Sequence, residues 1–440
     1  MAKRHLIGIG GVGMSALATA LVKLGDTVTG ADRTLGTPNI RFLESLGVRV
    51  FPDDGSGVDQ GTDEVIVSTA IEETNAGLRK AKALGIPVTH RAKALARTLG
   101  GYKLVAVVGT CGKSTVTAML GHVLAECGLD PMCVNGANVP GWEGAVRFGK
   151  GEYAVAEVDE SDKSLVAFKP YAAIVTNASA DHYSKEEMDE VFDAFIKDCE
   201  GPVVDGRGIV PSPFSATGAV TADPLANASR GDRDGTEWVT PLPGKHNLQN
   251  AALAAKMALA LGCGPEDVRR ALATFRGVER RLQLISPAIE QSSNRTIEQS
   301  PVVYDDYAHN PEKLKAMWTT LAEKHPEGIC VIWRPHGYAP LRKMMDALAA
   351  MFVETVRSQD ALLLLPVYDA GGTTDRSVTS DELLDRIRTF EQSNNRTILV
   401  PDLDAAYEWC VAHKGEFAAF VTCGARDPGL PVLAKRLSEM

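Results

Sequence analysis

Two glycine-rich junctions between a strand-like run and a helix-like run constrain the fold more than any other feature. IGIGGVGMS at 7–15 ends an apolar run and opens a helical pattern, and VVGTCGKSTVTAML at 107–120 repeats the arrangement later in the chain. A strand that ends in glycines and leads into a helix opens a parallel α/β unit, whose backbone N–H groups face an anionic ligand. Two such openings predict two separate nucleotide-binding units.

The remaining apolar runs extend this pattern to a three-unit α/β chain. Strand-like segments alternate with helical stretches, at 64–69, 85–90, 153–158, 172–177, 302–309, 329–333, 361–367 and 417–424. A chain of 440 residues is too long for a single ordinary domain. We therefore predict an α/β fold with domains at 1–100, 101–284 and 285–440.

Composition and charge exclude several classes of function. The net charge is −10 and no Lys/Arg-rich block occurs, so a nucleic-acid-binding surface is not expected. No signal peptide and no apolar run of membrane-spanning length occur, which predicts a cytoplasmic protein without a membrane partner. The eight cysteines are scattered without zinc-like spacing, which favours reduced thiols.

The loop Gly109–Thr115 predicts ATP binding. It is a shortened phosphate loop, since Val107 stands where the strict pattern has a glycine. The glycines expose backbone N–H groups, Lys113 supplies charge at the β- and γ-phosphates, and the Ser114 hydroxyl can bind Mg²⁺.

Acidic residues follow the next two predicted strands, where a magnesium site would need oxygen ligands. AEVDESDKS at 156–164 offers Glu157 first, and ASADHYS at 178–184 offers Asp181 and His182. Each cluster alone could be a solvated loop. Because both follow the same phosphate loop, we favour metal and substrate binding.

The first junction, Gly8–Gly13, matches GxGxxG, and Asp32 lies 19 residues further on. A nicotinamide oxidoreductase is one hypothesis. However, the first domain is about 100 residues long, which is short of a full two-half dinucleotide fold, and this hypothesis leaves the second glycine loop unexplained.

Three further motifs carry polar residues with two interpretations each. Asn247 is either a ligand contact or a helix N-cap. Arg281, in GVERRLQ, is either a phosphate ligand or a surface residue. His309, in DDYAHNP at 305–311, is either a nucleotide contact or a core histidine.

Taken in order, these motifs resemble the Mur ligase family, the ATP-dependent amino-acid ligases of peptidoglycan assembly. The resemblance covers nearly the whole chain and is strongest to the alanine-adding branch in GIGGVGMS, VSTAI, HRAKAL, EVDESDKS, RRLQ and RPHGY. It implies a Rossmann-like UDP-binding domain, a central P-loop ATPase domain and a C-terminal Rossmann-like domain.

The resemblance also implies the reaction, with ATP and Mg²⁺ required. ATP phosphorylates the carboxylate of UDP-N-acetylmuramate, and the amine of an amino acid, L-alanine as the first candidate, attacks the acyl phosphate. The alternatives are a ligase that recycles a preformed tripeptide, a paralogue with another amine, and a nucleotide-binding regulatory protein without turnover. Intact Lys113, Glu157, His182 and His309 argue against the last.

Residue roles follow from the resemblance by motif. The implied catalytic residues are Lys113, Glu157 and His182, and the implied magnesium ligands are Ser114, Glu157 and His182. The implied ATP contacts are Gly109, Thr110, Gly112, Lys113, Ser114, Thr115, Asn247, Arg281, Asp306 and His309. The implied UDP-sugar contacts are Gly10, Gly11, Gly13, Met14, Ser15 and Asp32.

Departures from the family pattern leave the amine substrate open. Cys111 and Ser114 stand where alanine-adding members usually have His and Thr. Gly337 and Pro340 replace a common arginine and another polar residue, with Arg342 nearby. DDYAHN is closer to the amino-acid-adding and recycling relatives.

Overall fold

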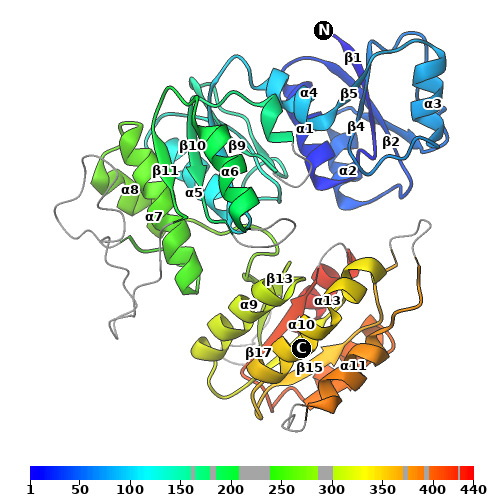
Figure 1. Ribbon diagram of the computed structural model, residues 1–440, viewed down its shortest axis with the longest axis vertical. Coiled ribbons are helices and arrows are strands. Elements are labelled where there is room, and N and C mark those ends of the chain that lie inside the picture. Colours follow the sequence, from blue (N-terminus) through cyan, green and yellow to red (C-terminus); the bar gives the residue numbers. More distant parts are fainter. Residues whose placement is uncertain are drawn as a thin grey trace, which may run out of the picture. The chain divides into compact units, whose positions relative to one another are not determined.

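The computed structural model describes residues 1–159, 164–178, 185–207, 238–285, 301–369, 375–390, 396–424 and 427–440. The chain forms two compact units, Met1–Val278 and Glu279–Met440. Three separate, mostly parallel sheets carry the helices (Figure 1). The predicted α/β class is confirmed.

The first sheet is wholly parallel and has the order β3-β2-β1-β4-β5. Its strands are β1 (Lys3–Ile7), β2 (Thr27–Asp32), β3 (Arg49–Pro52), β4 (Glu64–Val67) and β5 (Val88–His90), and its helices are α1 (Val12–Lys23), α2 (Pro38–Ser45), α3 (Ala76–Ala83) and α4 (Arg91–Thr98). The first glycine loop therefore joins the central strand β1 to α1.

The second sheet has the order β11-β10-β6-β9-β7-β8, with only β8 antiparallel. Its strands are β6 (Lys103–Val108), β7 (Met132–Val134), β8 (Val146–Arg147), β9 (Tyr153–Glu157), β10 (Ala172–Val175) and β11 (Val203–Asp205). Its helices are α5 (Lys113–Glu126), the 3-10 turn η1 (Ser164–Ala167), α6 (Lys185–Ile196), α7 (Lys245–Ala260) and α8 (Pro265–Ala273). The second glycine loop joins β6 to α5, between neighbours β10 and β9.

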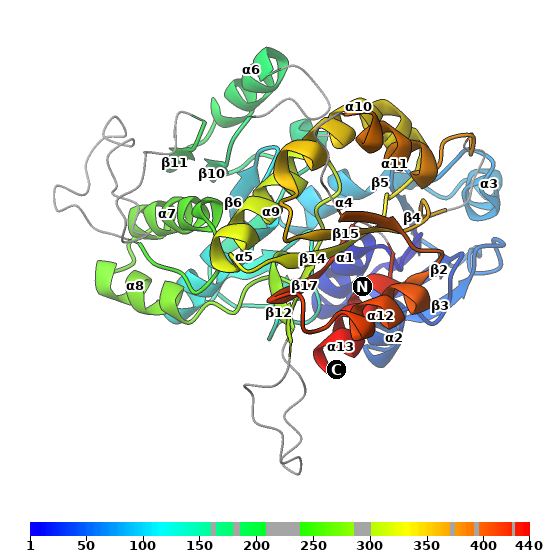
Figure 2. The same ribbon diagram turned by 90° about the horizontal axis from the view of Figure 1, so that it is seen from below.

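Side-chain alternation along β6 builds two cores. Val105 and Val107 pack with α5, α7 and α8, whereas Leu104, Ala106 and Val108 belong to the opposite face, which α6 covers (Figure 2). The apolar cluster that contains Leu104, Ala106 and Val108 also includes residues of α1 and α4, two helices of the first sheet. The shared apolar cluster explains why the first two sheets form one compact unit.

The third sheet has the order β12-β13-β17-β14-β15-β16, with only β12 antiparallel. Its strands are β12 (Gln283–Ile285), β13 (Val302–Asp306), β14 (Ile329–Trp333), β15 (Ala361–Leu364), β16 (Arg396–Leu399) and β17 (Ala419–Cys423). Its helices are α9 (Pro311–Lys324), α10 (Tyr338–Thr355), α11 (Ser380–Thr389), α12 (Leu403–Ala412) and α13 (Gly429–Ser438). Because β12 pairs with β13, the segment from Glu279 onward belongs to this second unit.

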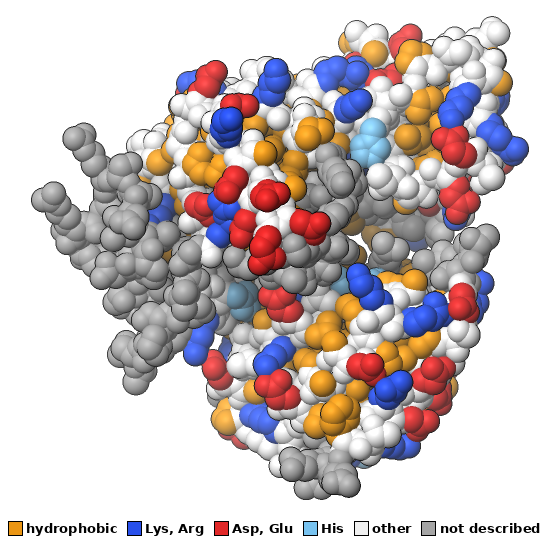
Figure 3. Space-filling view, viewed as in Figure 1, with side chains coloured by type: hydrophobic (Ala, Val, Ile, Leu, Met, Phe, Trp, Pro, Cys, Tyr) orange, Lys and Arg blue, Asp and Glu red, His pale blue; other side chains and the backbone are white. Residues whose placement is uncertain are grey.

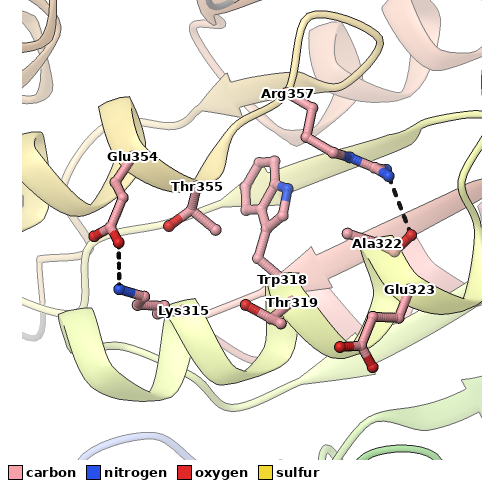
Figure 4. A pocket seen from close by; sticks show the side chains of 8 residues that line it. All are labelled: Lys315, Trp318, Thr319, Ala322, Glu323, Glu354, Thr355 and Arg357. Atoms are coloured by element: carbon pink, nitrogen blue, oxygen red, sulfur yellow. Dashed lines mark hydrogen bonds and ion pairs between the residues drawn. The ribbon is translucent and has the colours of Figure 1, made fainter. Parts of the chain in front are cut away.

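A buried carboxylate connects α9 and the segment after α10 to the amino-terminal ends of the strands of the third sheet. Asp360 is fully buried and accepts hydrogen bonds from Trp318 Nε1 at 2.9 Å, from the amide of Ile329 at 3.0 Å and from Arg357. Arg357 also donates to the carbonyl of Ala322, beside a cavity of about 380 Å³ (Figure 4). The cluster satisfies a buried charge and has a structural role.

All eight cysteines are free thiols. Within the described ranges, no helix is both long and apolar enough to cross a membrane.

Candidate nucleotide-binding site

The second glycine loop has the backbone geometry that its glycines predict. Gly109 and Gly112 have φ of 129° and 84°, in the region that favours glycine. A Cβ at Gly109 would overlap the Thr176 hydroxyl, and a Cβ at Gly112 would lie 2.7 Å from Asn250 Oδ1. Both positions therefore exclude side chains, and the loop leads directly into the amino terminus of α5.

Asn177, after β10, holds this loop from the side. Its Oδ1 accepts hydrogen bonds from Thr110 Oγ1 at 2.7 Å and from the amide of Cys111 at 2.9 Å, while its Nδ2 donates to the Cys111 carbonyl at 3.0 Å. Thr176 Oγ1 donates to the same carbonyl at 2.6 Å. The side chain of Asn177 thus mimics a backbone partner and fixes the loop.

Lys113 and the hydroxyl residues start α5. Lys113 Nζ donates to the Gly109 carbonyl at 2.6 Å and so lies across the loop. Ser114 and Thr115 are 4% and 5% exposed at the helix amino terminus, where the helix dipole favours an anion. Lys113 and Ser114 are thus the first two residues of α5, directly after the glycine loop.

Glu157 approaches the loop from the other side. It ends β9, and its register partner on β6 is Val107, two residues before Gly109. Its Oε2 accepts the amide of Gly136 at 2.7 Å, and a Cβ on Gly136 would overlap the carboxylate. Glu157 and Asn177 therefore flank the glycine loop from the two neighbouring strands.

Asn247 is buried in the same unit, on α7. Gly244 is the N-cap of α7, so the N-cap interpretation of Asn247 was wrong. The Asn247 Nδ2 donates to the Pro243 carbonyl at 2.7 Å, and its Oδ1 accepts Asn250 Nδ2 at 3.3 Å. Asn250 in turn lies against Gly112, which connects Asn247 to the phosphate loop.

The predicted magnesium ligand His182, and Asp181 beside it, lie outside the described residues. Among the residues that are described, no group of three or more His, Cys, Asp or Glu side chains is arranged to hold a metal ion. Of the predicted magnesium ligands, Ser114 and Glu157 are among the described residues.

The first glycine loop forms a second anion-binding geometry. Asp32 Oδ2 accepts the amide of Gly10 at 2.8 Å, and Gly11 is the N-cap of α1. Gly13 packs against Arg91, whose Nη1 would lie 3.1 Å from a Cβ there. The helix amino terminus and the Arg91 guanidinium therefore meet at one place.

Met14 and Ser15 are placed differently from the other predicted contacts of this loop. Both side chains are buried in α1, and Ser15 Oγ donates to the Val12 carbonyl. Only their backbone is close to the loop.

The second unit brings Arg281, Tyr307, His309 and His336 together. The Arg281 guanidinium lies 4.9 Å from the Tyr307 ring centroid. The His309 ring lies 5.6 Å from the Tyr307 ring and 4.7 Å from the His336 ring, with both pairs edge to face. Asp306, just before them, is 8% exposed and accepts the amides of Leu282 and Ala308 at 2.7 Å each.

Burial shifts the pKa of two of these groups. It lowers the pKa of His309 to about 4, with Lys313 acting in the same direction, so the imidazole is neutral at pH 7. Since the Tyr307 carbonyl can only accept, His309 Nδ1 carries the proton, and Nε2 keeps its lone pair. Burial also raises the pKa of Asp306.

Sequence reasoning missed Asn177, Thr176, Asn250 and Arg91. Asn177 is the last residue of a predicted strand, at its carboxyl end, which is the one signal that could have singled it out. The contact between Arg91 and Gly13 depends on the packing of α4 beside α1, which no local pattern shows.

A larger cavity of about 990 Å³ lies elsewhere in the first unit. It is lined by Tyr102 and Lys103 at the start of β6, by residues around η1 and by α6. Acidic side chains gather on the surface over α6 (Figure 3), including Glu187 and Glu190 of the lining. The cavity opens at the end of β6 opposite the glycine loop.

Comparison with known proteins gives two family matches. The Mur ligase family, catalytic domain, matches residues 3–103, and the Mur ligase, glutamate ligase domain, matches residues 293–426. Together they span more than half of the chain.

Curated relatives match almost end to end. A UDP-N-acetylmuramate–L-alanine ligase of Gloeobacter violaceus is 32% identical over 98% of this chain and 95% of its own length. One from Rubrobacter xylanophilus is 34% identical over 97% of each. The crystal structure of UDP-N-acetylmuramate-alanine ligase from Thermotoga maritima superposes with a TM-score of 0.78 at 25% identity, covering 100% of this chain and 99% of that one.

Proposed function

The chain belongs to the Mur ligase family, and on that premise we propose that it joins L-alanine to the carboxylate of UDP-N-acetylmuramate, using ATP, in peptidoglycan precursor synthesis. The observation that carries the proposal is the glycine loop of β6 and α5, with Lys113 on it and Glu157 and Asn177 on either side. Relatives of this named activity match nearly the whole chain, which supports the same substrate pair.

The first half-reaction transfers the γ-phosphoryl group to the sugar's carboxylate. A carboxylate oxygen forms the new P–O bond as the bond to ADP breaks, and the two anions must approach each other. Catalysis of such a transfer depends on positioning and on fixed positive charge. Lys113 would exchange its bond to the Gly109 carbonyl for a phosphate oxygen, while the loop amides and the amino terminus of α5 hold the others.

Mg²⁺ is the cation that fits the described donors. It binds through one or two carboxylate or hydroxyl oxygens and takes its remaining ligands from phosphate and water. Ser114 and Glu157 would supply those protein oxygens, and His182 is the third proposed ligand. The ion would neutralise charge on the phosphates during transfer.

In the second half-reaction the amine attacks the acyl phosphate carbon. A tetrahedral intermediate then expels inorganic phosphate and leaves an amide. The amine must be uncharged when it attacks, and the nucleotide must stay bound until transfer is complete. Asn247 on α7 is the proposed adenine contact.

The second unit would contribute Arg281, Asp306 and His309 to the nucleotide. Arg281 is suited to phosphate oxygens because its guanidinium presents several N–H donors in a plane. His309, neutral with a lone pair on Nε2, would accept a hydrogen bond from a hydroxyl group of the nucleotide.

The first glycine loop is the proposed UDP-sugar site, with Gly10, Gly11, Gly13 and the backbone of Met14 and Ser15 around the pyrophosphate. Asp32 holds the loop through Gly10, and we add Arg91 as a phosphate ligand because it sits at the amino terminus of α1. Both nucleotide substrates are soluble cell constituents, so the proposal assigns the reaction to the cytoplasm.

The amine has a second candidate, a preformed peptide. Gly337, the N-cap of α10, replaces a side chain that the family pattern would place there, and Arg342 is paired with Asp375 at 2.8 Å. A smaller residue at 337 leaves more room for a larger amine.

The test is phosphate release from Mg-ATP with UDP-N-acetylmuramate, scanned against L-alanine, glycine, L-serine and the L-Ala-γ-D-Glu-diaminopimelate tripeptide. We expect release that requires both the sugar nucleotide and L-alanine, and that is lost in Lys113→Ala. If the tripeptide is the one amine that supports phosphate release with UDP-N-acetylmuramate, the protein catalyses the recycling reaction. If no amine supports release with the sugar nucleotide, ligase activity is refuted.

A further inference from the structure

Arg280 makes an unusually complete set of contacts at the carboxyl ends of β13 and β17. Its Nε donates to Asp305 Oδ2 at 3.0 Å, and its Nη2 donates to the Gly424 carbonyl at 2.5 Å. Asp305 is fully buried and also accepts Thr422 Oγ1 at 2.7 Å. The guanidinium thus joins the entry segment of the second unit to two strands of its sheet.

The backbone around this arginine is held in a conformation that L-residues rarely adopt. Arg280 has φ of 57° and Leu282 has φ of 47°. The Arg280 amide donates to Gln283 Oε1 at 3.0 Å, and the Leu282 amide donates to Asp306 Oδ2 at 2.7 Å. Such conformations persist only where surrounding contacts determine them, and they concentrate at functional sites.

This turn places the guanidiniums of two adjacent arginines near the same aromatic ring. The Arg280 side chain is hydrogen-bonded at the carboxyl ends of β13 and β17, whereas the Arg281 guanidinium lies over the Tyr307 ring, 4.9 Å from its centroid. The Arg280 guanidinium lies 5.2 Å from the same ring. Both guanidiniums are thus within cation–π distance of Tyr307, and a shift of Arg280 would disturb both the ring and the segment that carries Arg281.

We propose that Arg280 is a positioning residue for the ligase reaction, which holds Arg281 and Tyr307 in the geometry that Arg281 needs to contact the nucleotide phosphates. The inference rests on the proposed function, because it assigns Arg280 a role only through Arg281. Arg280 itself does not touch the substrates.

The side chain must be arginine for a geometric reason. The planar fork reaches a carboxylate and a carbonyl at the same time, whereas a lysine ammonium has one nitrogen at the end of a flexible stem. Arg280→Lys keeps the positive charge beside Asp305 and loses the second anchor. It therefore tests positioning rather than charge.

Arg357→Lys is the matched control. Arg357 also donates to a fully buried carboxylate, Asp360, and to backbone carbonyls, but at the amino-terminal ends of the strands of the same sheet. The two variants therefore remove the same kind of interaction from the same unit. Only Arg280 is next to a proposed phosphate ligand.

The experiment measures kcat and the KM for ATP, the sugar nucleotide and L-alanine, together with the melting temperature. Wild-type turnover is established first, so that failure of the proposed function is seen independently of any variant. We expect Arg280→Lys to lower kcat at least about tenfold and to raise the KM for ATP, with the KM for the sugar nucleotide unchanged. Arg357→Lys should lower the melting temperature to a similar extent and keep kcat.

A double-mutant cycle with Arg281→Lys decides whether Arg280 acts through Arg281. If it does, adding Arg280→Lys to the Arg281→Lys variant causes little further loss. Independent, multiplicative losses would overturn the proposal, as would equal kcat in the Arg280→Lys and Arg357→Lys proteins. If Arg280→Lys does not fold, Thr422→Val replaces it, because this variant removes one hydrogen-bond donor to Asp305. We expect Thr422→Val to lower kcat below the wild-type value, and an unchanged kcat in this variant would also overturn the proposal.

Discussion

The side-chain amide of Asn177 bonds both backbone polar groups of Cys111, accepting from its N–H at 2.9 Å and donating to its carbonyl at 3.0 Å. Cys111 is in the middle of the phosphate loop, and Asn177 follows the neighbouring strand β10. The loop's shape is therefore fixed by a residue more than sixty positions away in sequence. Preorganisation of this kind lowers the entropic cost of binding a phosphate group.

Asn177→Ala should weaken ATP binding as well as the fold. Loss of its hydrogen bonds leaves the Cys111 backbone and Thr110 without these partners, and we expect the KM for ATP to rise about tenfold, with a stability loss of about 1–3 kcal/mol. Asn75→Ala is the control, since Asn75 is a buried asparagine that caps α3 and donates to Asp53. Steady-state kinetics and urea unfolding measure both effects, and equal KM values in the two variants would contradict this role.

Gly109→Ala should abolish nucleotide binding. The residue has φ of 129°, and an added Cβ would overlap Thr176 Oγ1 and lie 2.9 Å from the Asn177 carbonyl. Gly128→Ala also places a side chain at a positive φ, 81°, but with no atom within 4 Å of the new Cβ, and should cost only about 1–2 kcal/mol. Calorimetric titration with ATP distinguishes the two, and wild-type affinity in Gly109→Ala would refute the assigned loop geometry.

Stability should fall as the pH falls from about 6.5 to about 4, in part because of His5. Burial lowers the pKa of His5 to about 4, and the ring is fully buried with Nδ1 paired to Thr29 Oγ1 at 2.9 Å. The unfolded chain therefore binds a proton in this range that the folded chain excludes, which amounts to up to about 3 kcal/mol. His5→Gln should flatten the pH dependence of urea unfolding, and an unchanged slope would rule out this contribution.

The parts that the sequence predicted are those with a local signal. Alternating strands, helices and the two glycine loops follow from hydrophobic periodicity and from the need for N–H groups at a helix start, as at Gly112 and Lys113. Asn310 is likewise the N-cap of α9 and Pro311 its first residue, a local start signal of the same kind. These features depend on neighbours in sequence, so a single chain suffices to find them.

The parts that it did not predict depend on contacts between distant segments. No local pattern indicates that Asn177 bonds the Cys111 backbone or that Arg91 packs on Gly13. The positive φ of Arg280 and its bond to Gly424 likewise have no local signal. The pairing of β12 with β13 is of the same kind, since its three residues carry no periodicity of their own. Tertiary packing selects these arrangements, and local preference does not.

The acyl-phosphate route is tested most directly by following oxygen from the sugar's carboxylate. UDP-N-acetylmuramate labelled with ¹⁸O in both carboxylate oxygens is turned over with Mg-ATP and L-alanine, and the released phosphate is analysed by mass spectrometry. The proposed mechanism predicts one ¹⁸O atom in each phosphate and one in the amide product, because the carboxylate oxygen bonded to phosphorus leaves with it. Unlabelled phosphate, or release that does not require the sugar nucleotide, would contradict it.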